Sequence, residues 1–171
     1  WVTEPNRSHD GLVTSGTSRD LVKAMVVERH KSTGNIGKGL VRGLGLKKGA
    51  LATSVAHDSH NIVAAGVEDS DIFVAVTEVE ANGGGLAVVQ DGCVVASMPL
   101  SLAGLLSDLT LEKVVESLEE LDAKAKKLGC RVDSPFPILF FLALPVVSEL
   151  KLTDQGLVDV EMAWLLEPAT V

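Results

Sequence analysis

Short apolar runs separated by polar or glycine-containing turns dominate the hydrophobic pattern of this chain. The first run covers residues 21–27, is rich in β-branched residues and ends in a polar stretch. Two further runs, at 49–55 and 62–66, lie on either side of the polar segment 56–61 and are rich in Val, Ile and Ala. Runs of this length and composition are typical of strands, and those without alternation are typical of buried strands.

A hairpin is the most specific local prediction. The apolar runs 86–90 and 93–98 are separated by Asp91-Gly92. This dipeptide favours the two-residue turn that joins antiparallel strands, because both positions accept a positive φ. A further short strand is predicted at 157–160, after a turn at 153–156.

Helical periodicity appears in two segments. A third helix is predicted in an apolar stretch that is bounded by prolines. Residues 69–82 place Ile72, Phe73, Val76 and Val79 on one face, behind an acidic cap at 68–71. Residues 110–128 form a longer amphipathic pattern between an N-cap at Thr110 and a C-cap at Gly129. Its predicted apolar face contains Leu111, Val114, Val115, Leu118, Leu121, Ala125 and Leu128. The most apolar stretch, 135–147, contains three prolines and predicts a short buried helix.

These elements predict an α+β fold with a mixed or mainly antiparallel sheet and helices packed on one face. An open α/β sheet is the alternative. The length of 171 residues suits one domain with a proper core. We expect residues 1–20 to be a linker or fragment end and residues 21–171 to be that single domain, because residues 4–18 are polar without a period.

Charge, hydropathy and cysteine content exclude several classes of partner and site. The net charge of −8 repels phosphate backbones and anionic membranes, so neither nucleic acid nor a membrane is an expected partner. No apolar run approaches the ~20 residues that span a bilayer, which predicts a cytoplasmic location. Cys93 and Cys130 lie outside metal-binding or redox spacings and are expected to be structural thiols.

A basic, glycine-rich stretch spans residues 34–49. It contains six glycines together with Lys38, Arg42, Lys47 and Lys48. Its spacing matches neither the P-loop nor the dinucleotide fingerprint, so an irregular or bulged strand is preferred to a phosphate site.

The polar segment 56–61 contains the main candidates for chemistry: His57, Asp58, His60 and Asn61. A histidine can exchange protons near neutral pH, and a neighbouring aspartate can fix its tautomer. The amide of Asn61 offers a donor and an acceptor to a purine edge. Two alternatives stay open: a two-histidine metal site, which lacks further ligands nearby, and a capped, solvated turn with no chemistry.

Several motifs occur in one order and together identify a family. They are Arg29-His30-Lys31-Ser32-Thr33-Gly34-Asn35-Ile36-Gly37-Lys38-Gly39, Ala56-His57-Asp58-Ser59-His60-Asn61, Gly83-Gly84-Gly85, Gly104-Leu105-Leu106-Ser107-Asp108, Phe141-Leu142-Ala143-Leu144-Pro145 and the segment from Glu149 to Val160. In this order and approximate spacing, the chain resembles the C-terminal domain of amidohydrolase-type adenine deaminases from about Lys23 to about Val160.

The resemblance implies an accessory role in a purine-salvage hydrolase. Such enzymes convert adenine and water to hypoxanthine and ammonia, with a divalent transition metal held by a barrel domain of the same polypeptide. The chain lacks the His-x-His motif and the length of that barrel, so no cofactor is expected within it.

On this interpretation, His57, Asp58 and His60 are the catalytic candidates in a loop that covers or contacts the barrel's active site. Asn61, Arg29 and His30 are the substrate-binding candidates, and no residue is assigned to a metal. The alternatives are a free-standing purine-binding module and a structural or oligomerisation module, including a homo-oligomer.

Overall fold

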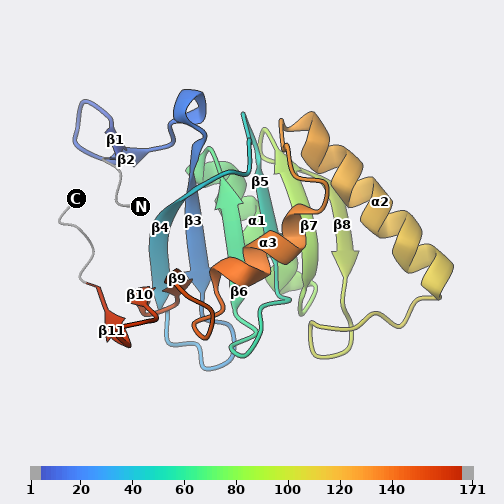
Figure 1. The fold of residues 1–171 in the computed structure, drawn as a ribbon. Coiled ribbons are helices and arrows are strands. Elements are labelled where there is room, and N and C mark those ends of the chain that lie inside the picture. The colour runs from blue at the N-terminus through green and yellow to red at the C-terminus, as the bar shows by residue number, and fades with distance from the viewer. Residues whose placement is uncertain (1–4, 167–171) are drawn as a thin grey trace.

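The computed structural model describes residues 5–166, and a six-stranded sheet forms its centre (Figure 1). The strands of this sheet are β3 (Leu21–Val27), β4 (Ile36–Arg42), β5 (Ala50–Thr53), β6 (Ile62–Gly66), β7 (Gly85–Gln90) and β8 (Cys93–Pro99). Their order is β4-β3-β6-β5-β7-β8, and every neighbouring pair is antiparallel. The predicted α+β class with an antiparallel sheet is therefore confirmed, and the open α/β alternative is wrong for the described residues.

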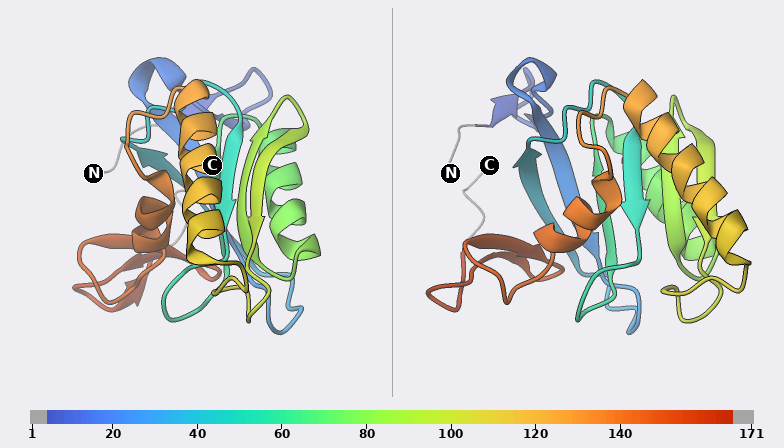
Figure 2. Two further views of the ribbon diagram at one scale, coloured as in Figure 1. Left: turned by 90° about the vertical axis from the view of Figure 1, so that its right-hand side faces the viewer. Right: turned by 45° about the vertical axis from the view of Figure 1, so that its right-hand side comes forward.

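Three α-helices cover both faces of the sheet. They are α1 (Asp69–Ala81), α2 (Leu111–Lys127) and α3 (Pro135–Leu142). Helix α1 packs on one face, and α2 and α3 pack on the other (Figure 2). The expectation that helices cover one face only is wrong. The reason is that β5 to β7 are apolar on both sides, so each face needs its own cover.

The remaining elements are short and lie at the margins of the sheet. They are β1 (Asn6–Arg7), β2 (Val13–Thr14), the 3₁₀ helix η1 (Thr17–Arg19), β9 (Leu150–Thr153), β10 (Gly156–Asp159) and β11 (Trp164–Leu165). Strands β9 and β10 form a hairpin that contains the predicted turn at 153–156 and the predicted strand after it, and they pack against the edge strand β4; the strand before the turn was not predicted. The hairpin packs on the face of β4 where Gly37 and Gly39 leave room, because a methyl group on Gly37 would overlap the Thr153 backbone and one on Gly39 would touch Leu152.

Helix α1 differs from its sequence pattern in two respects. Phe73, expected on the buried face, is 71% exposed, while Ile72, Ala75 and Val79 are buried against the sheet. No side chain caps the helix at its N-terminus. Instead the Asp71 carboxylate accepts a hydrogen bond of 2.7 Å from the backbone N–H in the turn of the β7–β8 hairpin.

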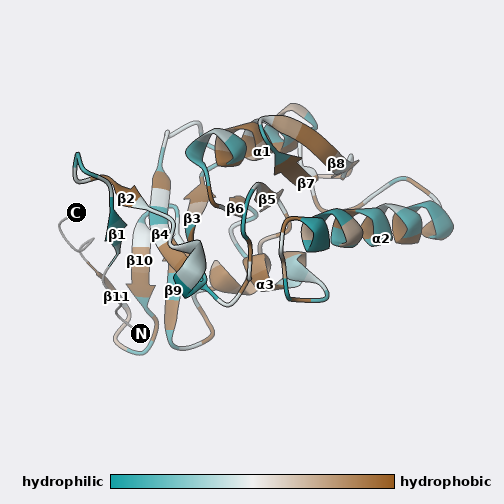
Figure 3. Ribbon diagram, turned by 90° about the horizontal axis from the view of Figure 1, so that it is seen from above, coloured by the Kyte–Doolittle hydropathy of each residue, from teal (hydrophilic) through white to brown (hydrophobic). Residues whose placement is uncertain are grey.

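The predicted bounds of helix α2 are confirmed, but only part of its predicted apolar face is buried. Leu121, Ala125 and Leu128 are buried, whereas Leu111, Val115 and Leu118 are exposed. Seen from above and coloured by hydropathy, α2 projects past the rest of the domain (Figure 3). Within the first two turns Val114 packs against the core, so Leu111, Val115 and Leu118 lie on the side of the helix that the sheet leaves uncovered. No helix in residues 5–166 is long and apolar enough to cross a membrane.

Candidate functional site

The antiparallel register brings five loops to one end of the central sheet. Val27 pairs with Ile62, Thr53 pairs with both Val63 and Leu86, and Gly85 pairs with Pro99. The loops that follow or precede these residues therefore meet. We call this region the loop end, and it comprises residues 28–35, 54–61, 82–84, 100–109 and the β9–β10 turn at 153–156. Five of the six motifs singled out in the sequence have residues there.

Arg29 holds three of these loops together. Its Nε donates to the carbonyl of His60 at 2.8 Å, its Nη1 to that of Gly83 at 2.9 Å, and its Nη2 to that of Ala103 at 2.8 Å. Partial burial lowers the pKa of its guanidinium, which still stays charged at any physiological pH. Three of its five donors are thus used by the backbone. Arg29 was expected to bind substrate, and the observed contacts support a positioning role.

Glycine is required where this arginine lies. Gly84 and Gly104 have positive φ angles of 127° and 72°, and a methyl group on either would overlap the other's backbone or the Arg29 guanidinium. The buried hydroxyl of Ser54 completes the junction. It accepts from the Gly85 N–H at 2.8 Å and donates to the Gly104 carbonyl at 2.6 Å. Sequence reasoning did not single out Ser54, although a serine next to a buried strand needs such partners.

His57 and His60 lie on the loop between β5 and β6. The His57 ring is exposed and makes an edge contact with Phe140 of α3, at 4.6 Å between ring centroids. The backbone N–H of His60 donates to the Ala56 carbonyl at 2.7 Å, which closes the loop. Asp58 and His60 have positive φ angles of 38° and 50°, so the turn is tight. Both histidines line the same apolar hollow.

Asp58 does not orient either histidine in this structure. Its side chain is exposed, and no hydrogen bond in the described residues joins it to His57 or His60. No contact of Asp58 in the described residues therefore supports the expectation that this aspartate fixes a histidine tautomer. His30, which is exposed, points its Nε2 at the carbonyls of Ser59 and His60, at 3.0 and 3.2 Å. His30 thus reinforces the loop that Arg29 holds.

Asn61 is buried and faces a carboxylate on another hairpin. Its Nδ2 donates to Asp154 Oδ1 at 3.2 Å, while Asn35 Nδ2 lies 3.4 Å from Asp154 Oδ2. Asp154 therefore joins the β9–β10 turn to the two loops that follow β3 and β5. This bond uses one of the two hydrogens of the amide, and the expected purine contact of Asn61 stays a prediction. The role of Asp154 was not predicted, since its partners are 93 and 119 residues away in sequence.

Glu28 fixes the loop after β3. Its carboxylate accepts backbone N–H bonds from His30, Lys31 and Thr33. Desolvation alone would raise the pKa of Glu28, but the bonds from Thr33, His30 and Lys31 outweigh it and lower the pKa to about 2. The carboxylate is consequently ionised throughout the neutral range. Sequence reasoning treated Glu28 only as the polar end of a strand.

The side chains at the loop end do not converge as metal ligands do. Residues 5–166 contain no group of three or more His, Cys, Asp or Glu side chains placed to hold an ion. His57 packs on an aromatic ring, and Asp58 points into solvent. The loop end therefore does not fit a metal centre of its own.

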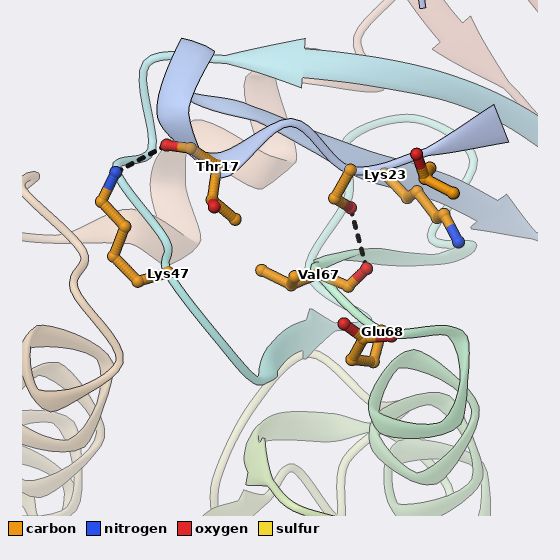
Figure 4. A pocket seen from close by; sticks show the side chains of 7 residues that line it. Thr17, Lys23, Lys47, Val67 and Glu68 are labelled. Atoms are coloured by element: carbon orange, nitrogen blue, oxygen red, sulfur yellow. Dashed lines mark hydrogen bonds between the residues drawn. The ribbon is translucent and has the colours of Figure 1, made fainter. Parts of the chain in front are cut away.

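A second hollow lies at the opposite end of the sheet (Figure 4). Its two lysines already have partners: Lys23 Nζ lies 2.7 Å from Asp69 Oδ1, and Lys47 Nζ donates to the Thr17 carbonyl at 2.6 Å. Ser15 Oγ donates to the Val67 carbonyl at 2.8 Å. The polar groups around this hollow thus fasten the N-terminal segment to the domain, and the basic stretch 34–49 contributes Lys47 to that contact.

Comparison with known proteins identifies relatives of the whole domain. Residues 1–163 match the family described as adenine deaminase C-terminal domain. The chain is 53% identical to the adenine deaminase of Dehalococcoides mccartyi over 163 residues, which are 95% of this chain and 28% of that protein. It is 56% identical over 151 residues to adenine deaminase 2 of Carboxydothermus hydrogenoformans, covering 88% of this chain and 26% of that protein. The adenine deaminase of Archaeoglobus fulgidus is 54% identical over 163 residues, covering 90% and 29% respectively.

Proposed function

This chain belongs to the adenine deaminase C-terminal domain family, and from that membership we propose that it works as one domain of a polypeptide that deaminates adenine. The chain spans a little over a quarter of the length of the curated relatives that it matches. In the proposed reaction, water adds to C6 of adenine and the 6-amino group leaves as ammonia, giving hypoxanthine. The catalytic barrel domain of the same polypeptide would hold the divalent transition metal.

One observation carries the proposal. Segments that are far apart in sequence meet at the loop end, where the Arg29 side chain binds backbone carbonyls of three loops and the Asn61 side chain binds that of Asp154. A domain with a purely structural role would not need one guanidinium that holds three loops in fixed positions. Such an arrangement preorganises a surface, and preorganised loops on a rigid sheet suit substrate contact or the covering of a neighbouring active site.

The roles of individual residues follow from their exposure. His57 is exposed and held against Phe140, so its ring is available to a neighbouring active site. His60 lines the same hollow. We assign these two histidines to proton exchange or substrate contact at the domain boundary. Asp58 adds a negative charge to the exposed tip of the loop. Arg29, His30 and Asn61 act as positioning residues that hold this loop in place.

The direct test is ammonia release from adenine. The complete polypeptide encoded with this chain should release ammonia, while the 171-residue chain alone should not and should retain no stoichiometric transition metal after purification. Turnover by the chain alone, or one tightly held metal per chain, would overturn the accessory role. A gene product that ended with this domain and lacked a barrel would favour a purine-binding or structural module instead. A role in purine salvage and a cytoplasmic location stay predictions.

A further inference from the structure

The loop after β8 and the first half of α2 expose an unusual amount of apolar surface. Six aliphatic side chains between positions 102 and 118 are 38–74% exposed: Leu102, Leu106, Leu109, Leu111, Val115 and Leu118. We call these six residues the apolar ridge. Single exposed aliphatic residues are common, but six of them gathered in one loop and the helix that follows it indicate an interaction surface.

Helical geometry places the three helical members of the ridge on one face. Leu111, Val115 and Leu118 have the i, i+4, i+7 spacing of one helical face, and that face continues into Leu121 and Ala125, which are buried by the sheet. The apolar stripe of α2 is therefore wider than the domain covers: Val114 and Leu121 pack on the core, and Leu111, Val115 and Leu118 are left exposed beside them within the described residues.

The loop part of the ridge is held in a fixed shape. Leu102 and Leu106 form an antiparallel bridge, with N–H to carbonyl bonds of 3.0 and 3.1 Å in the two directions. Arg29 binds the carbonyl of Ala103 between them. The two leucines are thus exposed on a rigid loop. They also line the hollow that contains His57 and His60, so the ridge borders the candidate site directly.

We propose that the apolar ridge docks onto the catalytic domain of the same polypeptide. This inference rests on the proposed function and deepens it by naming the surface. In the adenine deaminase of Dehalococcoides mccartyi, the part that matches this chain makes up 28% of the protein, so more than two thirds of that polypeptide lies outside the matching part. A body of that size, tethered to the domain, has a high effective concentration at this surface.

Charge favours this occupant over a second copy of the chain. Glu112, Glu116 and Glu119 follow Leu111, Val115 and Leu118 by one position each and form an acidic row along the exposed stripe. Pairing two such stripes would bring like charges together, and each chain also carries a net charge of −8. The ridge therefore fits an apolar patch with a basic rim.

The test uses the complete polypeptide with single cysteines on α2. Val115→Cys probes the ridge, and Glu120→Cys is the matched control, exposed on another side of the same helix. Maleimide labelling is quantified by mass spectrometry on the peptide that contains each position. The thiol of the Val115→Cys variant should react at least about 10-fold more slowly than that of the Glu120→Cys variant, because a docked partner excludes the reagent. A benzophenone attached at position 115 should crosslink to the part of the polypeptide that precedes this domain.

The outcomes separate the two proposals. Equal labelling at both positions would overturn the docking surface, even if the same preparation deaminates adenine. A crosslink between two copies, with labelling that speeds up on dilution, would also overturn it in favour of self-association. Protection and the expected crosslink without turnover of adenine would support the surface and contradict the activity.

Discussion

Replacing Arg29 tests whether one side chain holds the loop end together. Arg29→Ala removes three charge-assisted hydrogen bonds to backbone carbonyls of three different loops. A hydrogen bond to a charged group is worth about 1.5–3 kcal/mol when desolvated. Only the bond to the His60 carbonyl is part-buried, and the other two are open to solvent. Water can replace the exposed pair at little cost, so we expect a total loss of about 2–4 kcal/mol.

Two further variants sharpen this prediction. Arg29→Lys keeps the charge but cannot reach three carbonyls with one ammonium, so it should recover less than half of the loss. Arg42→Ala, at an exposed position at the end of β4, is the control and should change stability by no more than about 0.5 kcal/mol. Urea unfolding followed by circular dichroism measures all three. If Arg29→Ala is as stable as Arg42→Ala, the clamp contributes nothing to folding and the reasoning fails.

Three other predictions concern packing, the buried amide and pH. Leu121→Ala should cost about 2–5 kcal/mol because it opens a cavity under α2, whereas the exposed Leu118→Ala should cost about 1 kcal/mol or less; equal losses in urea would contradict the observed face. Asn61→Ala and Asp154→Ala should show a coupling of about 1–2 kcal/mol in a double-mutant cycle, and additive effects would mean that their contact is not energetically significant. Glu28 has a folded pKa of about 2, below its unfolded value, so its contribution is complete above the unfolded pKa and disappears as the pH falls towards 2. The amide NMR shifts of the three residues that bond to its carboxylate should titrate with that pKa, and Glu28→Gln should abolish this titration.

Local structure was largely predictable from the sequence. The apolar runs became β3, β5 and β6, and Asp91-Gly92 formed the expected hairpin with positive φ at both residues. These features depend on neighbouring residues in the chain. The hydrophobic pattern and the residue types in the turns therefore predict them. The helix bounds were equally local, because glycines such as Gly129 end them.

Long-range features were not predictable in the same way. Nothing local distinguishes Phe73 from Ile72, and only the position of α1 on the sheet decides which is buried. Helices on both faces follow from how the strands are ordered, which the sequence does not state. The partners of Arg29 and Asp154 lie 31 to 119 residues away, so their roles appear only when the loops meet. The motif order could indicate that these residues belong together, but it could not show what each one contacts.

The central claim is that the β5–β6 loop of this domain contributes to adenine deamination in the complete polypeptide. Its most direct measurement is the kcat and KM for adenine of His57→Ala, His60→Ala and Asp58→Asn in that polypeptide, with Phe73→Ala as the control. Phe73 is exposed too, but it lies near the start of α1, at the opposite end of the sheet from the loop. Loss of a positioned proton donor or acceptor typically lowers the rate ~10²–10⁴-fold, whereas loss of a binding contact mainly raises KM. We predict that at least one histidine variant loses activity on this scale with its melting temperature nearly unchanged, while Phe73→Ala keeps wild-type kinetics. Wild-type kinetics in all three loop variants would contradict the claim and leave the loop as a capped surface turn.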